Sequence, residues 1–438
     1  MKTIRPYPRL IITKKGTRWT ETGHPWIYEG EVIRAELPDG TEVVLPLRVT
    51  GEDSNASMGT TLPLCPLENG AIVDAISENG KYLGTGFISF YSKIRLRILS
   101  KNANDRFDEA FWRRRVRYAL DYRKTVMGPE DYKCCRLIFG EADGFPGLTV
   151  DRYNSLLSTE VLSIGTESIK DLLYRLLVEE LAKDGVDIIG LYERNESSIR
   201  RLEGMDTGKG WYALPGKEIP VSPVTEICEN GVKYAVDVEN GQKTGFFLDQ
   251  KYNRKAVAKL APGKKVLDCF THTGSFALNA ALGGAESVTA VDISETAIQM
   301  AKENAKRNGL TEKMQFVTTD VFDYLGDLLK RNEHPFDFII LDPPAFTKSR
   351  KTVKNAEKGY REINFLAMKL LPRGGYFATA SCSHFMPKEQ FLPMLQSAAK
   401  EAGVTLKQIE VRTQSPDHPI LPDVPETDYL KLYLFQVI

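Results

Sequence analysis

The sequence is poor in cysteine and histidine and has no excess of either charge. Six cysteines and five histidines are spread over 438 residues. There is no CxxC pair and no histidine cluster, so neither a disulfide framework nor a zinc site is indicated. The 58 basic residues balance 58 acidic ones. Bulk charge therefore gives no argument for nucleic-acid binding, and any basic surface has to be local.

Long hydrophobic runs are also missing. No apolar stretch approaches the ~20 residues that cross a bilayer, and the N-terminus MKTIRPYPRL lacks the apolar core of a signal peptide. We therefore expect no membrane association and a cytoplasmic location, where cysteines remain free thiols. The length exceeds that of one ordinary hydrophobic core and predicts two or three domains.

Three regions differ in pattern. Residues 1–92 hold short apolar runs between turn clusters, which predicts a small β-rich domain. Residues 93–220 mix strands with two helices, one over 108–126 with apolar residues on one side and arginines on the other. This arginine face is either solvated or turned toward RNA. Over residues 221–438, strands alternate with helices, which predicts an α/β fold with a doubly wound, mainly parallel sheet.

Four expected strands of that sheet are followed by an acid. The acids are Asp268, Asp292, Asp320 and Asp342. A single acid at this position is ordinary helix capping. Ligands of doubly wound sheets, however, bind outside the carboxyl ends of the strands. Four acids at successive strand ends therefore converge on one crevice.

The loop after the first strand narrows the choice of cofactor. It contains Gly274 but no G-x-G-x-x-G, so a pyrophosphate cradle is poorly supported. Asp292 lies 24 residues after Asp268, where a ribose diol is typically held. Ribose binding without pyrophosphate binding points to S-adenosylmethionine rather than a nicotinamide cofactor. The alternative for Asp292 is an N-cap of the helix starting near Glu295.

The most specific local motif is DPPAF, residues 342–346. Two successive prolines after an apolar strand give a rigid turn without backbone donors. Such a turn presents carbonyl groups and the Asp342 carboxylate to a flat heterocycle, with Phe346 available to stack. The next expected strand ends in the motif SCS, which places the Cys382 thiol at the same edge of the sheet. The alternative for Cys382 is a buried structural cysteine.

Longer segments match one known family. They are VLDCFTHTGSFALNAALGGAESVTAVDIS, DPPAFTKS, SCSHF, DHPILPDVPETDYLK, HPWIYEGEV, RLIFGEADGFPGLTVDRY and GQKTGFFLDQKYNR. They resemble the bacterial class I methyltransferases that make 5-methylcytidine in large-subunit ribosomal RNA. The resemblance covers nearly the whole chain. It implies a PUA domain over 1–92, a central β-β-α-β-β domain over 93–220 and a seven-stranded Rossmann-like catalytic domain over 221–438.

The resemblance also implies a cofactor site. The residues expected to contact S-adenosylmethionine are Gln250, Asp268, Gly274, Asp292, Asp320 and Asp342. Asp292 would take the ribose hydroxyls and Asp320 the adenine amine. Gly274 would allow close approach of the methionine part. Ser275 stands where related sequences often have a second glycine.

Covalent catalysis is implied as well. Carbon 5 of cytosine is a weak nucleophile, so the Cys382 thiolate would add to carbon 6 while Asp342 stabilises the charge that develops at N3. The target base must leave its stack to reach the thiol. The residues expected to contact RNA are Pro343, Pro344, Phe346, Lys348, Arg350 and Lys351, the last three through phosphates.

Two other functions stay open. Amino-group methyltransferases carry Asp-Pro-Pro followed directly by an aromatic, whereas Ala345 intervenes here, and their chemistry does not need Cys382. A non-enzymatic RNA-binding or ribosome-assembly protein would bind little cofactor and would not depend on Cys382. A homodimer through the PUA or central region is compatible with the sequence.

Overall fold

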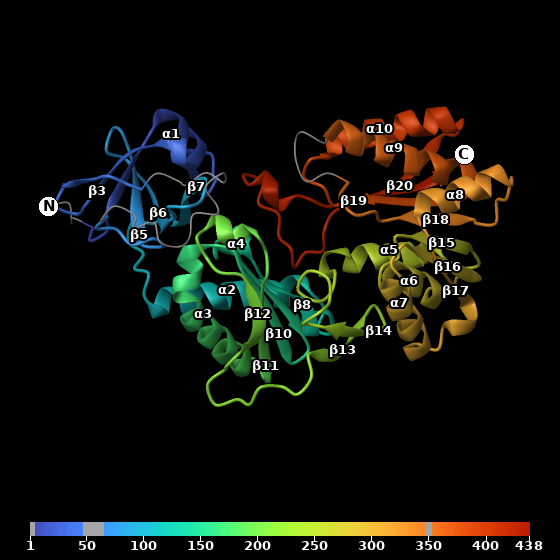
Figure 1. The fold of residues 1–438 in the computed structure, drawn as a ribbon, viewed down its shortest axis with the longest axis horizontal. Coiled ribbons are helices and arrows are strands. Elements are labelled where there is room, and N and C mark those ends of the chain that lie inside the picture. The colour runs from blue at the N-terminus through green and yellow to red at the C-terminus, as the bar shows by residue number, and fades with distance from the viewer. Residues whose placement is uncertain (1–4, 47–64, 347–352) are drawn as a thin grey trace. The chain divides into compact units, whose positions relative to one another are not determined.

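The computed structural model describes residues 5–46, 65–346 and 353–438. The chain divides into two compact units (Figure 1). Unit 1 comprises Met1–Thr225, Val236–Phe246 and Pro419–Val424, and unit 2 comprises Glu226–Ala235, Phe247–His418 and Pro425–Ile438. A short C-terminal segment thus belongs to the unit that is formed mainly by the N-terminal half of the chain.

The N-terminal sheet of unit 1 has seven strands in the order β2-β7-β6-β5-β1-β3-β4. The strands are β1 (Arg9–Ile12), β2 (Trp26–Tyr28), β3 (Val32–Glu36), β4 (Glu42–Val43), β5 (Ile72–Ser77), β6 (Tyr82–Ile88) and β7 (Ile94–Ser100). Helix α1 (Lys14–Glu21) follows β1 and begins after Thr13, whose side chain caps it. The predicted β-rich character of the N-terminal region is confirmed, and its sheet runs to Ser100.

The second sheet of unit 1 has five strands in the order β12-β11-β10-β9-β8. The strands are β8 (Cys134–Phe139), β9 (Leu148–Tyr153), β10 (Leu156–Val161), β11 (Gly190–Asn195) and β12 (Gly208–Tyr212). Helix α3 (Ile164–Lys183) connects β10 to β11, which pair in parallel, and the short helix α4 (Ile199–Leu202) follows β11. Three strands precede α3, so the sheet holds one strand more than the β-β-α-β-β pattern.

Helix α2 (Glu109–Val126) is the predicted arginine-rich helix, and it packs against α3. Arg113 pairs with Glu180 at 3.0 Å and Arg117 pairs with Asp184 at 2.7 Å, both on the α3 side. These arginines therefore join two helices, which neither interpretation of the arginine face anticipated. Periodicity located the helix but could not show that the acids of α3 lie opposite its basic side chains.

The sheet of unit 2 has seven strands in the order β17-β16-β15-β18-β19-β21-β20. The strands are β15 (Lys265–Cys269), β16 (Ser287–Asp292), β17 (Met314–Thr318), β18 (Phe338–Leu341), β19 (Tyr376–Ser381), β20 (Leu406–Arg412) and β21 (Lys431–Val437). Strands β15 to β19 pair in parallel, whereas β21 pairs antiparallel with β19 and β20. The predicted doubly wound, mainly parallel sheet is confirmed. A hairpin of β13 (Val224–Glu229) and β14 (Val232–Asp237) precedes it.

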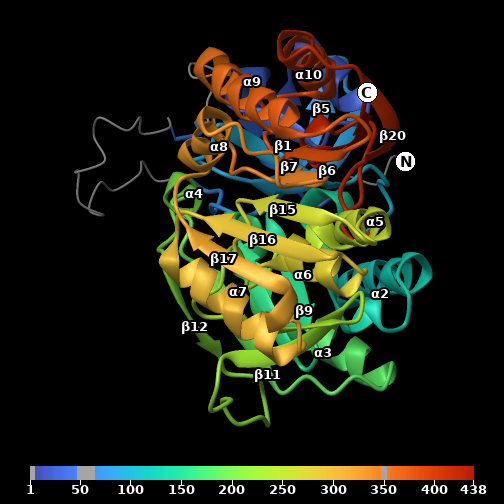
Figure 2. The same cartoon turned by 90° about the vertical axis from the view of Figure 1, so that its right-hand side faces the viewer.

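Helices cover both faces of this sheet. They are α5 (Lys251–Leu260), α6 (Ser275–Leu282), α7 (Glu295–Arg307), α8 (Val321–Lys330), α9 (Val353–Leu370) and α10 (Lys388–Ala402). Figures 1 and 2 show α5, α6 and α7 on one face and α8, α9 and α10 on the other. The second face holds a fully buried core that includes Leu341, Tyr360 and Leu395. Both faces of the parallel strands are thus shielded, as their continuous apolar sequences require.

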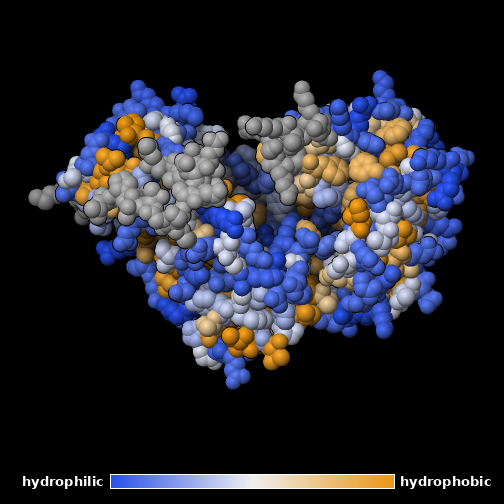
Figure 3. All heavy atoms as spheres, viewed as in Figure 1, coloured by the Kyte–Doolittle hydropathy of each residue, from blue (hydrophilic) through white to orange (hydrophobic). Residues whose placement is uncertain are grey.

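Hydrophobic side chains lie mainly in these cores, and the face seen in Figure 3 is largely hydrophilic. Exposed exceptions in unit 1 include Ile219 and Val221, in the segment after β12. Among the described residues, none of the helices combines the length and the apolar character that a membrane crossing needs.

Candidate active site

The candidate site lies in unit 2, where the strand order reverses between β15 and β18. The chain continues from β15 to β16 on one side, while β18 and β19 lie on the other. Cys269 pairs in register with Leu341, and Leu341 with Thr379. Asp268, Asp342 and Cys382 therefore lie at the carboxyl ends of three adjacent parallel strands, at the position where doubly wound sheets bind ligands.

Asp268 is a buried carboxylate with one satisfied oxygen. Its side chain is 1% exposed, and Oδ2 accepts hydrogen bonds from Thr271 Oγ1 at 2.6 Å and from the Ala277 amide at 2.9 Å. Oδ1 is buried and has no hydrogen-bond partner among the described residues. Burial, reinforced by the charges of Asp342 and Asp292, raises the pKa of Asp268 to about 7. A cationic donor placed at Oδ1 would give this oxygen a hydrogen-bond partner and would also favour the ionised carboxylate.

The loop after β15 has an unusual backbone. Phe270, His272 and Gly274 have φ angles of 62°, 49° and 79°, a region that side chains other than glycine enter at a cost. A Cβ atom on Gly274 would lie 3.0 Å from the Cβ of Ala301 in α7. The requirement for glycine therefore comes from the φ angle and from packing against α7. The predicted approach of a methionine part to Gly274 stays a prediction.

Asp292 binds the backbone of this loop. Its Oδ2 accepts from the His272 amide at 2.9 Å, and its Oδ1 accepts from the Ser294 amide at 2.9 Å. The N-cap of α7 is Ser294, whose hydroxyl accepts from the Ala297 amide at 3.2 Å. The alternative in which Asp292 caps that helix is therefore wrong. The half-buried Asp292 carboxylate instead holds the loop after β15 and the segment after β16 together through these two hydrogen bonds.

Asp320 differs from the other three acids. Its Oδ1 accepts from the amides of Phe322 and Asp323, at 2.8 and 3.3 Å, and so caps α8. The structure thus gives Asp320 the ordinary capping role, and a contact between Asp320 and adenine stays a prediction.

Asp342 is oriented by a glutamine from another segment. The Nε2 group of Gln250 donates to both Asp342 oxygens, at 3.1 Å each. Gln250 is 4% exposed and ends the 3-10 helix η4 (Leu248–Gln250) ahead of α5. After Asp342 the chain turns through Pro343, which is buried, and Pro344, which is exposed. The resemblance implied that Gln250 contacts the cofactor, whereas the contact seen here is with Asp342.

Phe346 already has aromatic neighbours. Its ring lies 4.6 Å from that of Tyr360 and 6.1 Å from that of Phe322, measured between centroids. The half-buried ring therefore helps to close the core beneath α8 and α9, and its stacking on a base stays a prediction. The basic residues Lys348, Arg350 and Lys351 lie outside the described residues.

Cys382 follows directly on β19 and is half-buried. Beside it, the Ser381 hydroxyl donates to the Tyr360 hydroxyl at 3.2 Å. Burial raises the pKa of Tyr360 to about 12, and the charges of Cys382 and Asp342 both contribute to the rise. The pKa of this one phenol is thus raised by the charges of both the thiol and the carboxylate.

Lys431 is a residue of this site that the sequence reasoning missed. It begins β21, opposite Ser381 of β19, and is 2% exposed. Its ammonium donates to the carbonyl oxygens of Ser383 at 2.7 Å and Tyr429 at 2.9 Å. Burial lowers the pKa of Lys431 to about 8, although the negative charge of Cys382 opposes this effect. A lysine at the start of the apolar strand KLYLFQV was the available signal.

Cys269 is a contrasting thiol. It is fully buried within β15, and this burial raises its pKa well above the usual thiol range. Such a thiol remains protonated and unreactive. We therefore interpret Cys269 as a packing residue of the sheet.

Comparison with known proteins adds to this geometry. Residues 212–436 match a family model described as S-adenosylmethionine-dependent methyltransferase, and residues 60–101 match a PUA-like domain. A protein of Klebsiella pneumoniae strain 342 called ribosomal RNA large subunit methyltransferase I is 34% identical over 435 residues, covering 99% of each chain. A protein of the same name from Aeromonas salmonicida strain A449 is 39% identical over 364 residues, covering 83% of this chain and 89% of its own.

Solved structures show the same fold. A methyltransferase crystallised with SAH aligns with a TM-score of 0.76 at 21% identity, covering 98% of this chain and 99% of its own. A sam-dependent methyltransferase structure from Streptococcus mutans aligns with a TM-score of 0.75 at 21% identity, with the same coverage. At this level of identity the likeness concerns the fold alone. None of these comparisons supports the homodimer.

Proposed function

The chain belongs to the family of S-adenosylmethionine-dependent methyltransferases, and from this premise we propose that it methylates carbon 5 of a cytidine in large-subunit ribosomal RNA. The names of the relatives supply the class of substrate. The observation that carries the choice of atom is the position of Cys382 and Asp342, at the ends of the adjacent parallel strands β19 and β18. A thiol beside a carboxylate is what covalent activation of a pyrimidine requires.

The donor set at β15 fits S-adenosylmethionine, which supplies an electrophilic methyl group when bound. The buried Oδ1 of Asp268 lacks a donor, and an ammonium group such as that of the methionine part would satisfy it. Asp292, at the end of β16, would hold the ribose hydroxyls. The Thr273 hydroxyl is also buried without a partner among the described residues, so the same loop offers a second polar contact.

The chemistry assigned to Cys382 follows from the weakness of carbon 5 as a nucleophile. The Sγ thiolate adds to carbon 6 of the pyrimidine, and the electron pair of the 5,6 double bond moves to carbon 5. Carbon 5 can then accept the methyl group. A base removes the proton from carbon 5, the double bond returns, and the carbon–sulfur bond breaks to release the thiolate. The target base has to be unstacked for this attack.

Asp342 would act at the opposite side of the ring. As the thiolate adds, negative charge spreads toward N3, and a protonated Asp342 or a hydrogen bond through it would stabilise this charge. The amide of Gln250 keeps the carboxylate in one orientation. Pre-orientation of this kind lowers the barrier because the group need not rearrange during the reaction.

Lys431 would support the thiolate. Its ammonium is held by the carbonyl of Ser383, the residue next to Cys382, and it is shielded from water. A positive charge near a thiol favours the ionised form, which is the nucleophile. The same ammonium would hold the backbone next to Cys382 in place through the Ser383 carbonyl. Lys431 would thus both position the thiol and favour its ionised form.

Methylation of an exocyclic amine is the alternative reaction. The Asp-Pro-Pro turn is shared with enzymes of that type, and such a transfer has no use for Cys382. The deciding experiment incubates unmodified large-subunit ribosomal RNA with methyl-labelled S-adenosylmethionine and identifies the labelled nucleoside by mass spectrometry. We expect 5-methylcytidine with the wild type and with Cys228→Ala, a control that removes an exposed thiol, and none with Cys382→Ala.

Trapping the adduct tests the mechanism directly. In RNA that contains 5-fluorocytidine the proton at carbon 5 is replaced by fluorine, so elimination stops after methyl transfer. The wild type should then form a covalent complex that survives denaturing electrophoresis, and Cys382→Ala should not. Label in another nucleoside, or full activity without Cys382, would refute the proposed reaction.

A further inference from the structure

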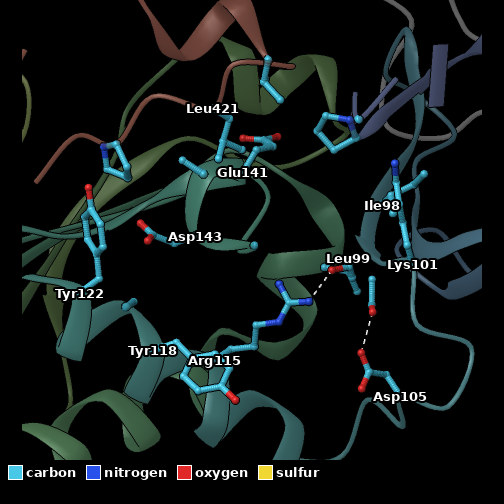
Figure 4. A pocket seen from close by; sticks show the side chains of 18 of the residues that line it. Ile98, Leu99, Lys101, Asp105, Arg115, Tyr118, Tyr122, Glu141, Asp143 and Leu421 are labelled. Atoms are coloured by element: carbon cyan, nitrogen blue, oxygen red, sulfur yellow. Dashed lines mark hydrogen bonds between the residues drawn. The ribbon is translucent and has the colours of Figure 1, made fainter. Parts of the chain in front are cut away.

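A pocket of about 720 Å³ lies in unit 1, and the methyl-transfer chemistry does not use it (Figure 4). Its walls come from the end of β7, from α2, from the 3-10 helix η3 (Gly140–Asp143) and from the segment Pro419–Val424. This volume is in the range of small-molecule sites. Three acids and three basic residues line the pocket. Whether it attracts an anion or a cation therefore depends on which of these side chains are already paired with an opposite charge.

The acids are already paired. Asp143 receives two hydrogen bonds from the buried guanidinium of Arg123, at 2.5 and 2.7 Å. Glu141 Oε1 accepts from Arg97 at 3.0 Å and from the Trp26 indole at 2.9 Å. The third acid, Asp105, accepts from the Ser100 hydroxyl at 2.6 Å and faces Arg114 at 3.6 Å. No acid in the pocket therefore remains as an isolated negative charge.

Arg115 is different, because its guanidinium has no carboxylate partner among the described residues. It donates to the carbonyl oxygen of Leu99 at 2.6 Å and lies 4.8 Å from the ring centre of Phe111. It also covers Gly144, where a Cβ atom would lie within 1.7 Å of Nη1. Burial lowers the pKa of Arg115, although the charge of Asp105 opposes this effect. A partly desolvated cation that lacks a counterion attracts an anionic ligand.

Two exposed aromatic rings line the same pocket as this cation. Tyr118 and Tyr122 lie one turn apart on α2, and both line the pocket together with Arg115 (Figure 4). They are 62% and 37% exposed. An exposed ring exchanges water for a stacking partner at little cost, and every nucleic-acid base offers a flat face.

We propose that this pocket binds a nucleotide of a single-stranded RNA segment, with a phosphate at Arg115 and a base against Tyr118. The proposal rests on the proposed function in taking RNA as the ligand, and it adds a second contact outside the reacting nucleotide. A duplex keeps its bases stacked inside, whereas a single strand presents base and phosphate together. The pairing of a cation with exposed rings therefore favours the single strand, and Lys101, which donates to the Thr20 carbonyl at 2.6 Å, adds positive charge at the rim.

The test measures binding of a short fluorescein-labelled single-stranded RNA to the full chain by fluorescence anisotropy over a range of salt concentrations. We expect Tyr118→Ala to weaken binding by roughly tenfold, the effect of losing one stacked base. Arg115→Gln should weaken binding and flatten the plot of log affinity against log salt by about 0.7, the contribution of one phosphate contact to a single strand.

Arg113→Gln is the matched control. It removes the same charge from the same helix, but Arg113 is engaged with acids on α3. It should leave RNA affinity unchanged once thermal melting shows that all variants are folded. Equal affinities for Tyr118→Ala, Arg115→Gln and wild type would overturn the proposal. So would equal losses in Arg113→Gln and Arg115→Gln, or a duplex that competes as well as the single strand.

The methyl-transfer assay separates this inference from the proposed function. If the wild type binds the single strand through Tyr118 and Arg115 but methylates no cytidine, RNA binding at the pocket is supported and the proposed function is refuted. If the wild type methylates cytidine while Tyr118→Ala and Arg115→Gln bind RNA as tightly as the wild type, the proposed function is supported and RNA binding at the pocket is refuted.

Discussion

The side-chain amide of Gln250 donates to both carboxylate oxygens of Asp342, with each N–O distance 3.1 Å. The direction of the amide is determined, because Gln250 Oε1 accepts from Asn253 Nδ2 at 2.6 Å. Exchanging the positions of the Gln250 amide oxygen and nitrogen would break this bond and would place Gln250 Oε1 against the Asp342 carboxylate, so that two acceptors would face each other. A carboxylate oxygen has two lone pairs, and the hydrogen bond from Gln250 uses one on each Asp342 oxygen. Gln250 therefore positions the carboxylate without occupying it fully.

The first prediction concerns Gln250. Gln250→Leu should reduce kcat roughly tenfold because Asp342 loses its orienting donor. Gln250→Glu should also reduce kcat, since an ionised carboxylate has no N–H group to donate to Asp342. Kinetics with labelled S-adenosylmethionine and RNA would measure both. Gln299→Glu, which makes the same charge change at an exposed position on α7, should behave as the wild type. Equal kinetics for Gln250→Glu and Gln299→Glu would contradict the positioning role.

The second prediction concerns Lys431. Lys431→Met keeps the aliphatic length of the side chain but removes the charge that is held at the Ser383 carbonyl. Alkylation of Cys382 by iodoacetamide near neutral pH should slow by roughly tenfold, because less thiolate is present. Cys382→Ala gives the background from other thiols. Lys407→Met, at an exposed position of β20, is the matched control. Unchanged alkylation in Lys431→Met would leave Lys431 with a packing role only.

The sequence predicted the sheet of unit 2 because each of its strands carries a complete local signal. An apolar run such as FIIL, residues 338–341, needs cover on both faces, and the helices between the strands provide it. The converging ends of β15 and β18 then follow from the handedness of the crossover connections. Asp268 and Asp342 could therefore be placed at one edge without coordinates.

Pairings over long sequence distances could not be predicted in this way. Lys431 reaches the neighbourhood of Cys382 only because β21 runs antiparallel beside β19, and nothing in either segment specifies this register. The same holds for Gln250, which precedes Asp342 by 92 residues. The four acids looked equivalent in the sequence, yet Asp320 caps α8 while Asp268 is left with an unsatisfied oxygen. Burial and local backbone direction separate these roles.

The third prediction links Asp268 to pH. The pKa of Asp268 is raised to about 7 from 3.8, so the folded protein holds this proton over a range in which the unfolded chain has lost it. The protonated Asp268 side chain contributes stability that is fully present below its pKa in the unfolded chain. This contribution is lost as the pH rises through its pKa in the folded protein. Between about pH 4 and about pH 7 the free energy of unfolding should therefore fall, by on the order of 4 kcal/mol from this group. Urea denaturation at several pH values should show this fall in the wild type but not in Asp268→Asn.

Cofactor binding should release the same proton. A cationic group at Oδ1 favours the ionised carboxylate, so below the folded pKa the proton leaves Asp268 when S-adenosylmethionine binds. Calorimetry in two buffers of different ionisation enthalpy, at about pH 6, should report release by the wild type and none by Asp268→Asn. Proton release that persists in the variant would assign it to another group.

The last prediction separates two reasons for a glycine at position 274. Gly274 and Gly309 both have positive φ angles, 79° and 66°, but only at Gly274 would a Cβ atom meet another side chain, Ala301 at 3.0 Å. Gly309→Ala should therefore cost about 1 kcal/mol of unfolding free energy for backbone strain alone. Gly274→Ala should cost more and should also weaken S-adenosylmethionine binding, because any shift of the loop moves Thr271, which holds Asp268. Ala301→Gly removes the opposing methyl group, so in a double-mutant cycle it should recover the excess cost of Gly274→Ala but not the strain. Full additivity of the two substitutions would mean that the loop relaxes away from α7, and the glycine would then be needed for its φ angle alone.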